Sequence, residues 1–146
     1  MLTPHFSLYE LLRSDSEQRF KSNLQSVSNI EIQNLCRLCT DILEPIRKEF
    51  GYPIVVNSGY RSAFTNSAVG GASTSLHLSG CAVDFTISER ARLYDIYEYI
   101  KANFEFAELI LYKDRNYKSR FIHVACDYSP KLIDVQQRMI TKIVVR

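Results

Sequence analysis

The spacing of apolar residues along the chain predicts helices in three regions. Between Ser28 and Phe50, apolar residues recur at every third or fourth position, which is the period of a helix with one buried face. Gly51 follows this run and is the residue type that most often ends a helix. Ser7 and Glu10 have the spacing of a capping box. The predicted helices are residues 7–12, residues 28–50 and a segment from Ser88 or Glu89 to Ala102.

Short apolar runs rich in β-branched and aromatic residues predict the strands. The run from Phe106 to Tyr112 and the run from Phe121 to Cys126 are joined by a polar, basic segment. This arrangement predicts a β-hairpin with its turn between Lys113 and Arg120. The predicted strands are residues 53–57, 81–87, 106–112 and 121–126.

Three other segments lack a clear period. Ser14 to Asn29 is polar and rich in serine, and Ala63 to Thr74 is rich in small residues with two adjacent glycines. Both are predicted to be exposed loops, the first with room for one helical turn. The tail from Pro130 to Arg146 carries scattered apolar residues and predicts either a helix or a late strand.

Length and composition are typical of a single globular domain, which we expect to span residues 1–146. The chain is 46% hydrophobic and 23% charged, which are ordinary values for a folded domain. Its net charge of +2 and the lack of a basic block argue against a nucleic-acid partner. No apolar run has the length of a membrane span, and the N-terminus lacks the pattern of a secretory signal. We therefore expect a cytoplasmic monomer that another system must release if its substrate lies outside the membrane.

The four cysteines do not have the spacing of a disulfide framework and are expected to be reduced. Cys36 and Cys39 form a Cys-x-x-Cys pair, but no second pair follows, and both fall on the apolar face of the long predicted helix. Buried thiols are expected there rather than a metal site. Cys126 follows His123 closely and is a weaker candidate metal ligand than Asp84.

His77 and Asp84 are the strongest candidates for metal chemistry. They lie seven residues apart across Gly80, and neutral imidazole and ionised carboxylate are both ordinary zinc ligands. Asp84 falls in an apolar, strand-like run, where a buried carboxylate needs a positive partner. His123 has similar surroundings and is the candidate third ligand, whereas His5 does not have them. On spacing alone, hydrogen bonding without a metal is the more frequent situation for such residues.

Four motifs in a fixed order carry a resemblance that spacing alone does not. They are Ser58-Gly-Tyr-Arg-Ser62, Asn66 with Val69-Gly-Gly-Ala72, Ser75-x-His77-x-x-Gly80-x-Ala82-x-Asp84, and Phe121-Ile-His-Val124. Together they resemble the zinc D-alanyl-D-alanine carboxypeptidases, a family that includes phage L-alanyl-D-glutamate endolysins and vancomycin-resistance D,D-dipeptidases. The resemblance covers about residues 4 to 127.

The resemblance implies an α+β fold of the hedgehog/D-Ala-D-Ala peptidase type, with a small antiparallel sheet and helices packed on one face. It implies a zinc ion held by His77, Asp84 and His123, and cleavage of peptide bonds in the stem peptides of peptidoglycan. Arg61 matches the arginine of the family that holds a substrate carboxylate or polarises the scissile carbonyl; the alternative is a surface arginine in a turn. Ser75 is a candidate for orienting the loop or His77 and for binding substrate, and a helix or turn cap explains it equally well.

The sequence departs from the family at the general base. Many members have Asp or Glu three residues before the last histidine, where this chain has Arg120, and a cation does not accept a proton. The hairpin offers Glu108 instead: with the turn at residues 116–117, His123 pairs with Ile110 and shares its face with Glu108. A slip of one residue would move Glu108 to the other face. The alternative for Glu108 is a solvated or ion-paired strand residue.

Three functions are consistent with the sequence. The first is a zinc peptidase that acts on peptidoglycan, of the D,D-carboxypeptidase or the L-alanyl-D-glutamate endopeptidase type. The second is a metal-binding but catalytically weak peptidoglycan-binding module, which Arg120 favours. The third is a structural subunit of a phage or conjugative particle that has the fold without the activity. A carboxylate beside the metal would favour the first function, and a chain that binds no metal would favour the third.

Overall fold

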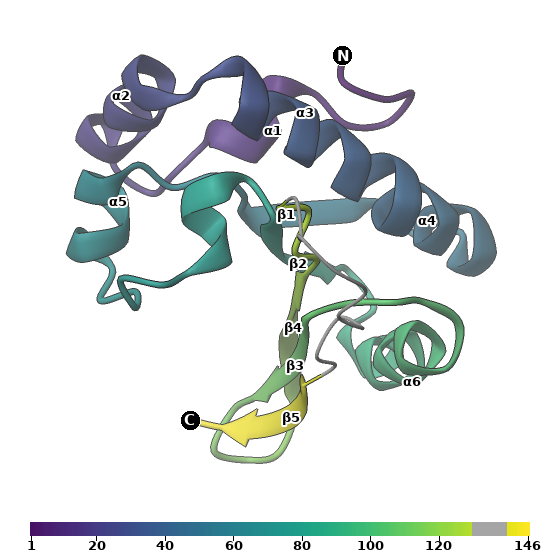
Figure 1. Cartoon of the computed structure of the whole chain (residues 1–146). Helices are drawn as coiled ribbons and strands as arrows, with labels where there is room; N and C mark the ends of the chain where they lie inside the picture. The colour runs from purple at the N-terminus through teal and green to yellow at the C-terminus, as the bar shows by residue number, and fades with distance from the viewer. Residues whose placement is uncertain (130–139) are drawn as a thin grey trace.

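The computed structural model describes residues 1–129 and 140–146, and these residues form an α+β structure built on one sheet (Figure 1). The long helical region is divided into α3, a π-helical stretch η1, and α4. In chain order the elements are α1 (Leu8–Leu12), α2 (Glu17–Ser26), α3 (Asn29–Leu38), η1 (Cys39–Leu43), α4 (Glu44–Phe50), β1 (Ile54–Ser58), α5 (Ala63–Ala68), η2 (Leu76–Ser79), β2 (Ala82–Ile87), η3 (Arg90–Arg92), α6 (Leu93–Asn103), β3 (Glu108–Lys113), β4 (Ser119–Ala125) and β5 (Ile140–Val145).

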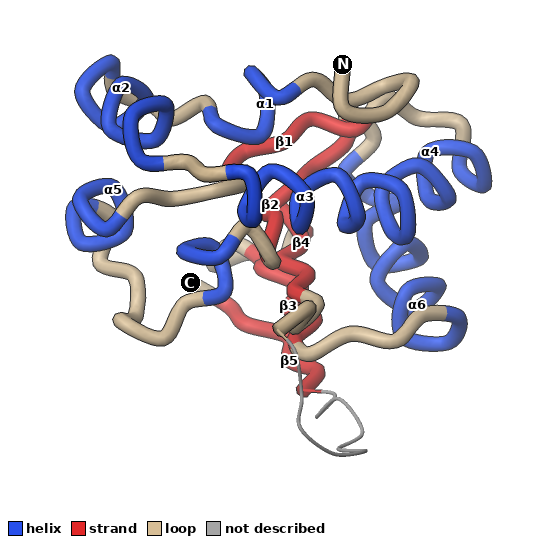
Figure 2. Tube along the Cα trace, turned by 45° about the horizontal axis from the view of Figure 1, so that its top comes forward, coloured by secondary structure: helices blue, strands red, loops and turns tan. Residues whose placement is uncertain are grey.

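The sheet has the strand order β1-β2-β4-β3-β5, and its neighbours are antiparallel except for the parallel pair β3 and β5. The β2–β4 register pairs Asp84 with His123 and Phe85 with Ile122. Since successive side chains point to opposite faces, Phe85 and Ile122 enter the core while Asp84 and His123 lie on the other face. Figures 1 and 2 show α5 and α6 on opposite sides of the strands. The predicted α+β fold with a mostly antiparallel sheet is confirmed, but the helices do not all lie on one face, because α5 lies on the side opposite α6. The parallel strand β5 is a further difference from the prediction.

The hydrophobic core lies between one face of the sheet and the helices α1, α3, α4 and α6. Each of these helices turns its apolar stripe to the sheet, as the 3.6-residue period requires. This packing leaves the opposite face of β2, β4 and β3 free to carry polar side chains. Core residues from the helices include Leu11, Leu12, Leu35, Leu38, Leu43, Ile46, Leu93, Ile96 and Ile100, and those from the strands include Val83, Phe85, Leu109, Leu111, Ile122 and Val124.

The long helix predicted from Ser28 to Phe50 is confirmed in extent but is not uniform. Its start has a capping box formed by Ser28 and Glu31, and its end has Gly51 in the left-handed conformation with φ 73°. Residues 39–43 are π-helical just before Pro45. Proline has no N–H to donate to the preceding turn, so a local change of hydrogen bonding is expected there.

The segment from Ser14 to Asn29, predicted to be a loop, contains the ten-residue helix α2, so that prediction is wrong. Ser16 caps α2 by accepting a hydrogen bond from the backbone N–H of Arg19. The side chain of Asn23 is buried and donates to the carbonyl of Leu12 at 2.8 Å. It also accepts from the N–H of Ser62 at 2.9 Å. A polar residue fills the inward position here, which is why the hydrophobic period does not reveal this helix.

The segment from Ala63 to Thr74 was also predicted to be a loop, and its first half is instead helix α5. Ser62 caps α5 by accepting a hydrogen bond from the N–H of Thr65. Thr65 is buried and donates to the backbone carbonyl of Arg19 in α2. The helix is therefore held to its neighbour by hydrogen bonds rather than by an apolar stripe, and the second half of the segment is irregular, as predicted.

The predicted hairpin and its register are confirmed: β3 and β4 are antiparallel, and Ile110 pairs with His123. The turn includes Tyr117, which has a positive φ of 61°. In the tail, residues 140–145 form a strand, one of the two predicted alternatives, whereas residues 130–139 lie outside the described residues. The helix predicted up to Ala102 is η3 followed by α6. No helix formed by the described residues is long and apolar enough to cross a membrane.

Candidate metal centre

The structure brings together the three residues that the sequence predicts as metal ligands. Asp84 on β2 and His123 on β4 are register partners, and His77 approaches them from η2. The Nδ1 atom of His123 lies 2.8 Å from Oδ1 of Asp84. The Nε2 atom of His77 lies 3.3 Å from the same oxygen. One candidate ligand atom from each residue lies within 4.8 Å of the other two, which is the grouping that a single metal ion requires.

The orientation of the His77 ring indicates a cation at this centre. Its Nδ1 lies 2.7 Å from the carbonyl oxygen of Gly59, and because a carbonyl only accepts, Nδ1 carries the proton. In the neutral ring, Nε2 then presents a lone pair toward the carboxylate of Asp84. Nε2 is buried and has no hydrogen-bond partner among the described residues. Two electron-rich atoms that face each other in a buried site fit a positive ion between them.

The electrostatics of Asp84 agree with this interpretation. Burial alone would raise the pKa of Asp84, but positive charge and hydrogen bonds placed at His77 and His123 outweigh burial and lower the pKa well below its ordinary value; a metal ion between these groups would have the same effect. Nη2 of Arg61 lies 3.3 Å from the second carboxylate oxygen of Asp84. The carboxylate is therefore ionised at neutral pH and available as a ligand.

Arg61 lies beside the centre in a defined position. Its Nε donates to the hydroxyl of Ser58 at 3.0 Å, and Nη1 donates to Oδ1 of Asn66 at 3.5 Å. Its backbone N–H donates to the carbonyl of His77 at 3.0 Å, which ties η2 to the end of β1. The side chain is only 15% exposed, so the interpretation as a surface arginine does not hold.

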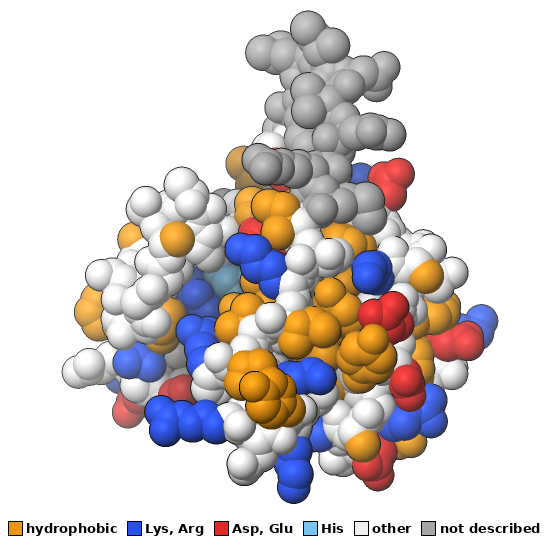
Figure 3. All heavy atoms as spheres, turned by 90° about the horizontal axis from the view of Figure 1, so that it is seen from below, with side chains coloured by type: hydrophobic (Ala, Val, Ile, Leu, Met, Phe, Trp, Pro, Cys, Tyr) orange, Lys and Arg blue, Asp and Glu red, His pale blue; other side chains and the backbone are white. Residues whose placement is uncertain are grey.

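The centre opens into a cleft of about 340 Å³ on the polar face of the sheet. Figure 3 shows histidine atoms at the bottom of a hollow on this face, with Lys or Arg side chains around it. The cleft is large enough for a few residues of a peptide rather than a folded partner. Its lining residues are Arg61, Val69, Gly70, Gly71, Ala72, Thr74, Ser75, His77, Asp84, Glu108, Ile110, Tyr112, Phe121, His123 and Arg146.

Glu108 lies on the side of the sheet that the hairpin argument predicts. It lines the cleft, and its Oε2 is 4.0 Å from Nε2 of His123. Among the described residues, Glu108 and Asp84 are the two acidic residues that line the cleft. Arg120, at the position where the family has its base, lines a different hollow together with Arg13 and Asp15. The register of the hairpin thus supplies a carboxylate that the local motif lacks.

Ser75 acts as a cap in the structure. Its hydroxyl accepts a hydrogen bond from the backbone N–H of His77 at 3.3 Å and so begins η2. Ser75 also lines the cleft, so its hydroxyl is accessible to a substrate.

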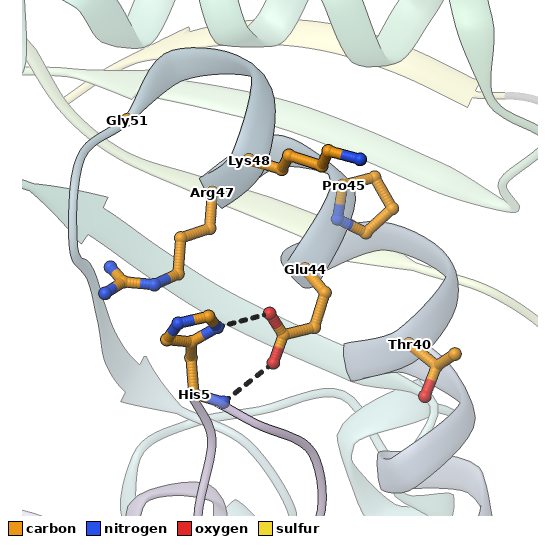
Figure 4. Close-up of a pocket in the computed structure, with 7 residues that line it drawn as sticks. All are labelled: His5, Thr40, Glu44, Pro45, Arg47, Lys48 and Gly51. Atoms are coloured by element: carbon orange, nitrogen blue, oxygen red, sulfur yellow. Dashed lines mark hydrogen bonds and ion pairs between the residues drawn. The ribbon is translucent and has the colours of Figure 1, made fainter.

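The weaker candidate Cys126 lies outside the centre, and so does His5, which was not expected to be a ligand. Cys126 is buried, and its thiol points to the carbonyl of Glu105 at 3.7 Å. His5 contacts Glu44, with Nδ1 at 2.7 Å from Oε2, at the edge of a hollow of about 710 Å³ (Figure 4). This hollow is larger than the cleft at the metal centre, but Glu44 is already engaged there by hydrogen bonds from Thr3 and from the backbone N–H of His5.

The sequence reasoning missed two groups at the site, the Gly59 carbonyl and Arg146, and assigned no role to a third, Tyr112. The Gly59 carbonyl orients His77, but a backbone group leaves no trace in a residue pattern. Tyr112 lines the cleft, and its place on the face of His123 was predictable from the hairpin, although no role was assigned to it. Arg146 lines the cleft from the end of β5, which pairs with a strand distant in sequence.

Comparison with known proteins adds one finding. A family model described as Peptidase M15 matches residues 4–125. No curated protein matches the chain. The matched range contains all three candidate ligands together with Arg61 and Glu108, and it ends at the last residue of β4, so β5 follows it.

Proposed function

The chain belongs to the peptidase M15 family, the zinc D-Ala-D-Ala carboxypeptidase family, and from this membership we propose that it is a zinc-dependent peptidase that cleaves peptidoglycan stem peptides. The observation that carries the proposal is the buried Nε2 of His77, which faces an ionised carboxylate without a hydrogen-bond partner among the described residues. His77, Asp84 and His123 would hold the zinc. Bound there, zinc supplies a Lewis acid that activates water and polarises the scissile carbonyl.

In this proposal Glu108 is the general base. Its carboxylate lies on the cleft side of His123, where it can accept the proton of the attacking water and later deliver it to the leaving amine. The side chain is 37% exposed, so it can adjust by the fraction of an ångström that proton transfer requires.

Arg61 is the proposed substrate-binding residue. Its guanidinium is fixed by Ser58 and Asn66 and faces the cleft beside Asp84. A planar guanidinium held in this way can bind a substrate carboxylate in bidentate fashion or stabilise the negative charge that develops on the carbonyl oxygen. Ser75 adds a hydroxyl on the same wall.

The alternative is a metal-binding module with weak catalysis, which Arg120 at the usual position of the base would favour. The position of Glu108 argues for the enzyme, because a carboxylate faces the centre from the neighbouring strand. A structural subunit of a phage or conjugative particle would need neither the His77 orientation nor the carboxylate. Synthesis in the cytoplasm, the monomeric state and the route to the cell wall stay predictions.

The test measures zinc and cleavage on the same samples. Wild type and His77→Ala are loaded with zinc, dialysed and analysed for metal content, and both are incubated with purified peptidoglycan. We expect one zinc per wild-type chain and new termini in the digest, with both lost in the variant. Released D-alanine would indicate a carboxypeptidase, and a new amino terminus on glutamate an endopeptidase. Zinc without cleavage would favour the weakly catalytic module, and a chain that takes up no zinc would refute the proposal.

A further inference from the structure

Strand β5 adds a second basic wall to the cleft. It pairs in parallel with β3, and the register places Lys142 beside Ile110 and Val144 beside Tyr112. The alternation of side chains puts Lys142 and Val144 on the face that carries His123, and Arg146 is next in the same phase. The backbone N–H of Arg146 donates to the carbonyl of Lys113 at 3.0 Å, so the strand pairing extends to this residue.

The Arg146 guanidinium is held on an aromatic platform. Its Cζ lies 4.6 Å from the centre of the Tyr112 ring. The Tyr112 ring stacks on that of Phe121, with ring centres 4.5 Å apart and an angle of 21° between the planes. All three residues line the cleft. An arginine stacked on a ring keeps the N–H groups at its edge available, so it can still donate two hydrogen bonds to a carboxylate.

The charge of Arg146 is not balanced within the cleft. Arg61 has Asp84 at 3.3 Å, whereas no ion pair among the described residues includes Arg146. The other acidic group of the cleft, Glu108, lies four positions before Tyr112 on β3, which is about 13 Å along an extended strand. Lys142 adds a further positive charge on the same face of β5. An anionic group entering the cleft would therefore find, on the β5 side, a cation that has no acidic side-chain partner among residues 1–129 and 140–146.

We propose that Arg146 is a specificity-determining residue that binds a carboxylate of the substrate peptide on the β5 side of the cleft. This inference rests on the proposed peptidase function and adds a substrate class to it. Arg61 stands at the β1 side of the centre and Arg146 at the β5 side, with β2, β4 and β3 between them. The preferred substrate is thus a peptide with an acidic group beyond the one that Arg61 binds. Arg146 lies outside residues 4–125, the range that the family model matches.

The experiment compares stem peptides that differ only by a carboxylate or a carboxamide at one position, each position being changed in turn. Binding is measured by calorimetry and cleavage by kcat and KM, with the zinc-loaded full chain. Arg146→Gln removes the charge, Arg146→Lys retains it without the bidentate edge, and Arg115→Gln in the exposed turn is the matched control for net charge. Thermal unfolding of each variant reports whether β5 remains in place.

We expect wild type to prefer the carboxylate at one position by about 10-fold or more, as a hydrogen-bonded charge pair gives. Arg146→Gln should lose this preference mainly through KM, Arg146→Lys should keep part of it, and Arg115→Gln should keep all of it. Tyr112→Leu, which removes the platform, should also reduce it. Equal binding of every peptide pair by wild type, or a preference that survives in Arg146→Gln, would overturn the inference. Binding decides this point even if no peptide is cleaved, and absence of cleavage would refute the proposed function alone.

Discussion

Replacing Glu108 by glutamine tests the proposed chemistry most directly. The substitution keeps the size and shape of the side chain and removes its negative charge and its ability to accept a proton. The strand pairing of Glu108 with Ala125 and Ile140 uses the backbone and should persist. General base catalysis contributes about 10²- to 10⁴-fold, so kcat should fall by that factor, which corresponds to a rise of about 3–5 kcal/mol in the activation free energy.

The structure separates this role from an indirect one. A residue that merely orients a metal-binding histidine needs a hydrogen bond to it, and its loss weakens metal binding by about 10- to 100-fold. Glu108 Oε2 lies 4.0 Å from Nε2 of His123, which is longer than a hydrogen bond. Zinc affinity should therefore change little in Glu108→Gln, while kcat should fall.

The assay measures kcat and KM on stem peptides over a range of pH, with zinc retention after dialysis determined on the same protein. Glu105→Gln is the control, because Glu105 is exposed, precedes the same strand and carries the same charge. A kcat for Glu108→Gln within about threefold of wild type would refute the assignment of the base. Activity that returns on adding excess zinc would show instead that Glu108 supports the metal centre.

Three further predictions concern stability and reactivity. Burial, assisted by neighbouring groups, raises the pKa of Cys39 to about 12, and burial raises the pKa of Cys126 to about 11. Cys81 is also buried, so a thiol reagent should react with Cys36 alone in the native protein. After unfolding, it should react with all four cysteines. Burial tends to raise the pKa of Glu44, but hydrogen bonds from His5 and Thr3 outweigh burial and lower the pKa. The ionised carboxylate therefore stabilises the fold above the ordinary glutamate pKa, and this contribution is lost as the pH falls through the depressed value. Thermal unfolding of wild type and Glu44→Gln should thus differ at pH 7 and converge as the pH falls below the ordinary glutamate pKa and through the depressed value. A difference independent of pH would contradict this account. Gly80 has φ 71°, and an added Cβ would lie 2.5 Å from the carbonyl oxygen of Glu31. Gly80→Ala should therefore lower the free energy of unfolding, measured in urea, by at least the roughly 1–2 kcal/mol that a left-handed residue costs. Gly70 has φ 73° and open space around it, so Gly70→Ala should cost only that amount.

Local signals predicted the parts of the fold that depend on local contacts. The capping residues Ser7 and Ser28 and the left-handed Gly51 fixed helix ends, and the hairpin arithmetic placed Glu108 on the face of His123. The helix α2 escaped prediction because its inward position is Asn23, whose partners come from distant segments.

The missed parts of the site are nonlocal. The period of the tail is compatible with a strand, but nothing in residues 140–145 indicates that the partner is β3 or that the pairing is parallel. Arg146 could not be placed without that partner. The candidate ligands Asp84 and His123 were recognised because carboxylate and histidine are rare inside apolar runs, a signal that survives without knowledge of the fold. His77 was recognised by its spacing from Asp84.

The hydrogen bond between His77 and the carbonyl of Gly59 has a consequence for how this site tolerates mutation. Where a side chain orients a ligand, a single codon change deletes the orienting group. A carbonyl remains whatever residue occupies the position, so substitution cannot remove it but can only displace it. Displacement is the vulnerability here, because a Cβ on Gly59 would lie 2.3 Å from the carbonyl oxygen of Leu11. A substitution that disturbs the candidate ligand His77 can therefore occur eighteen residues away, at Gly59.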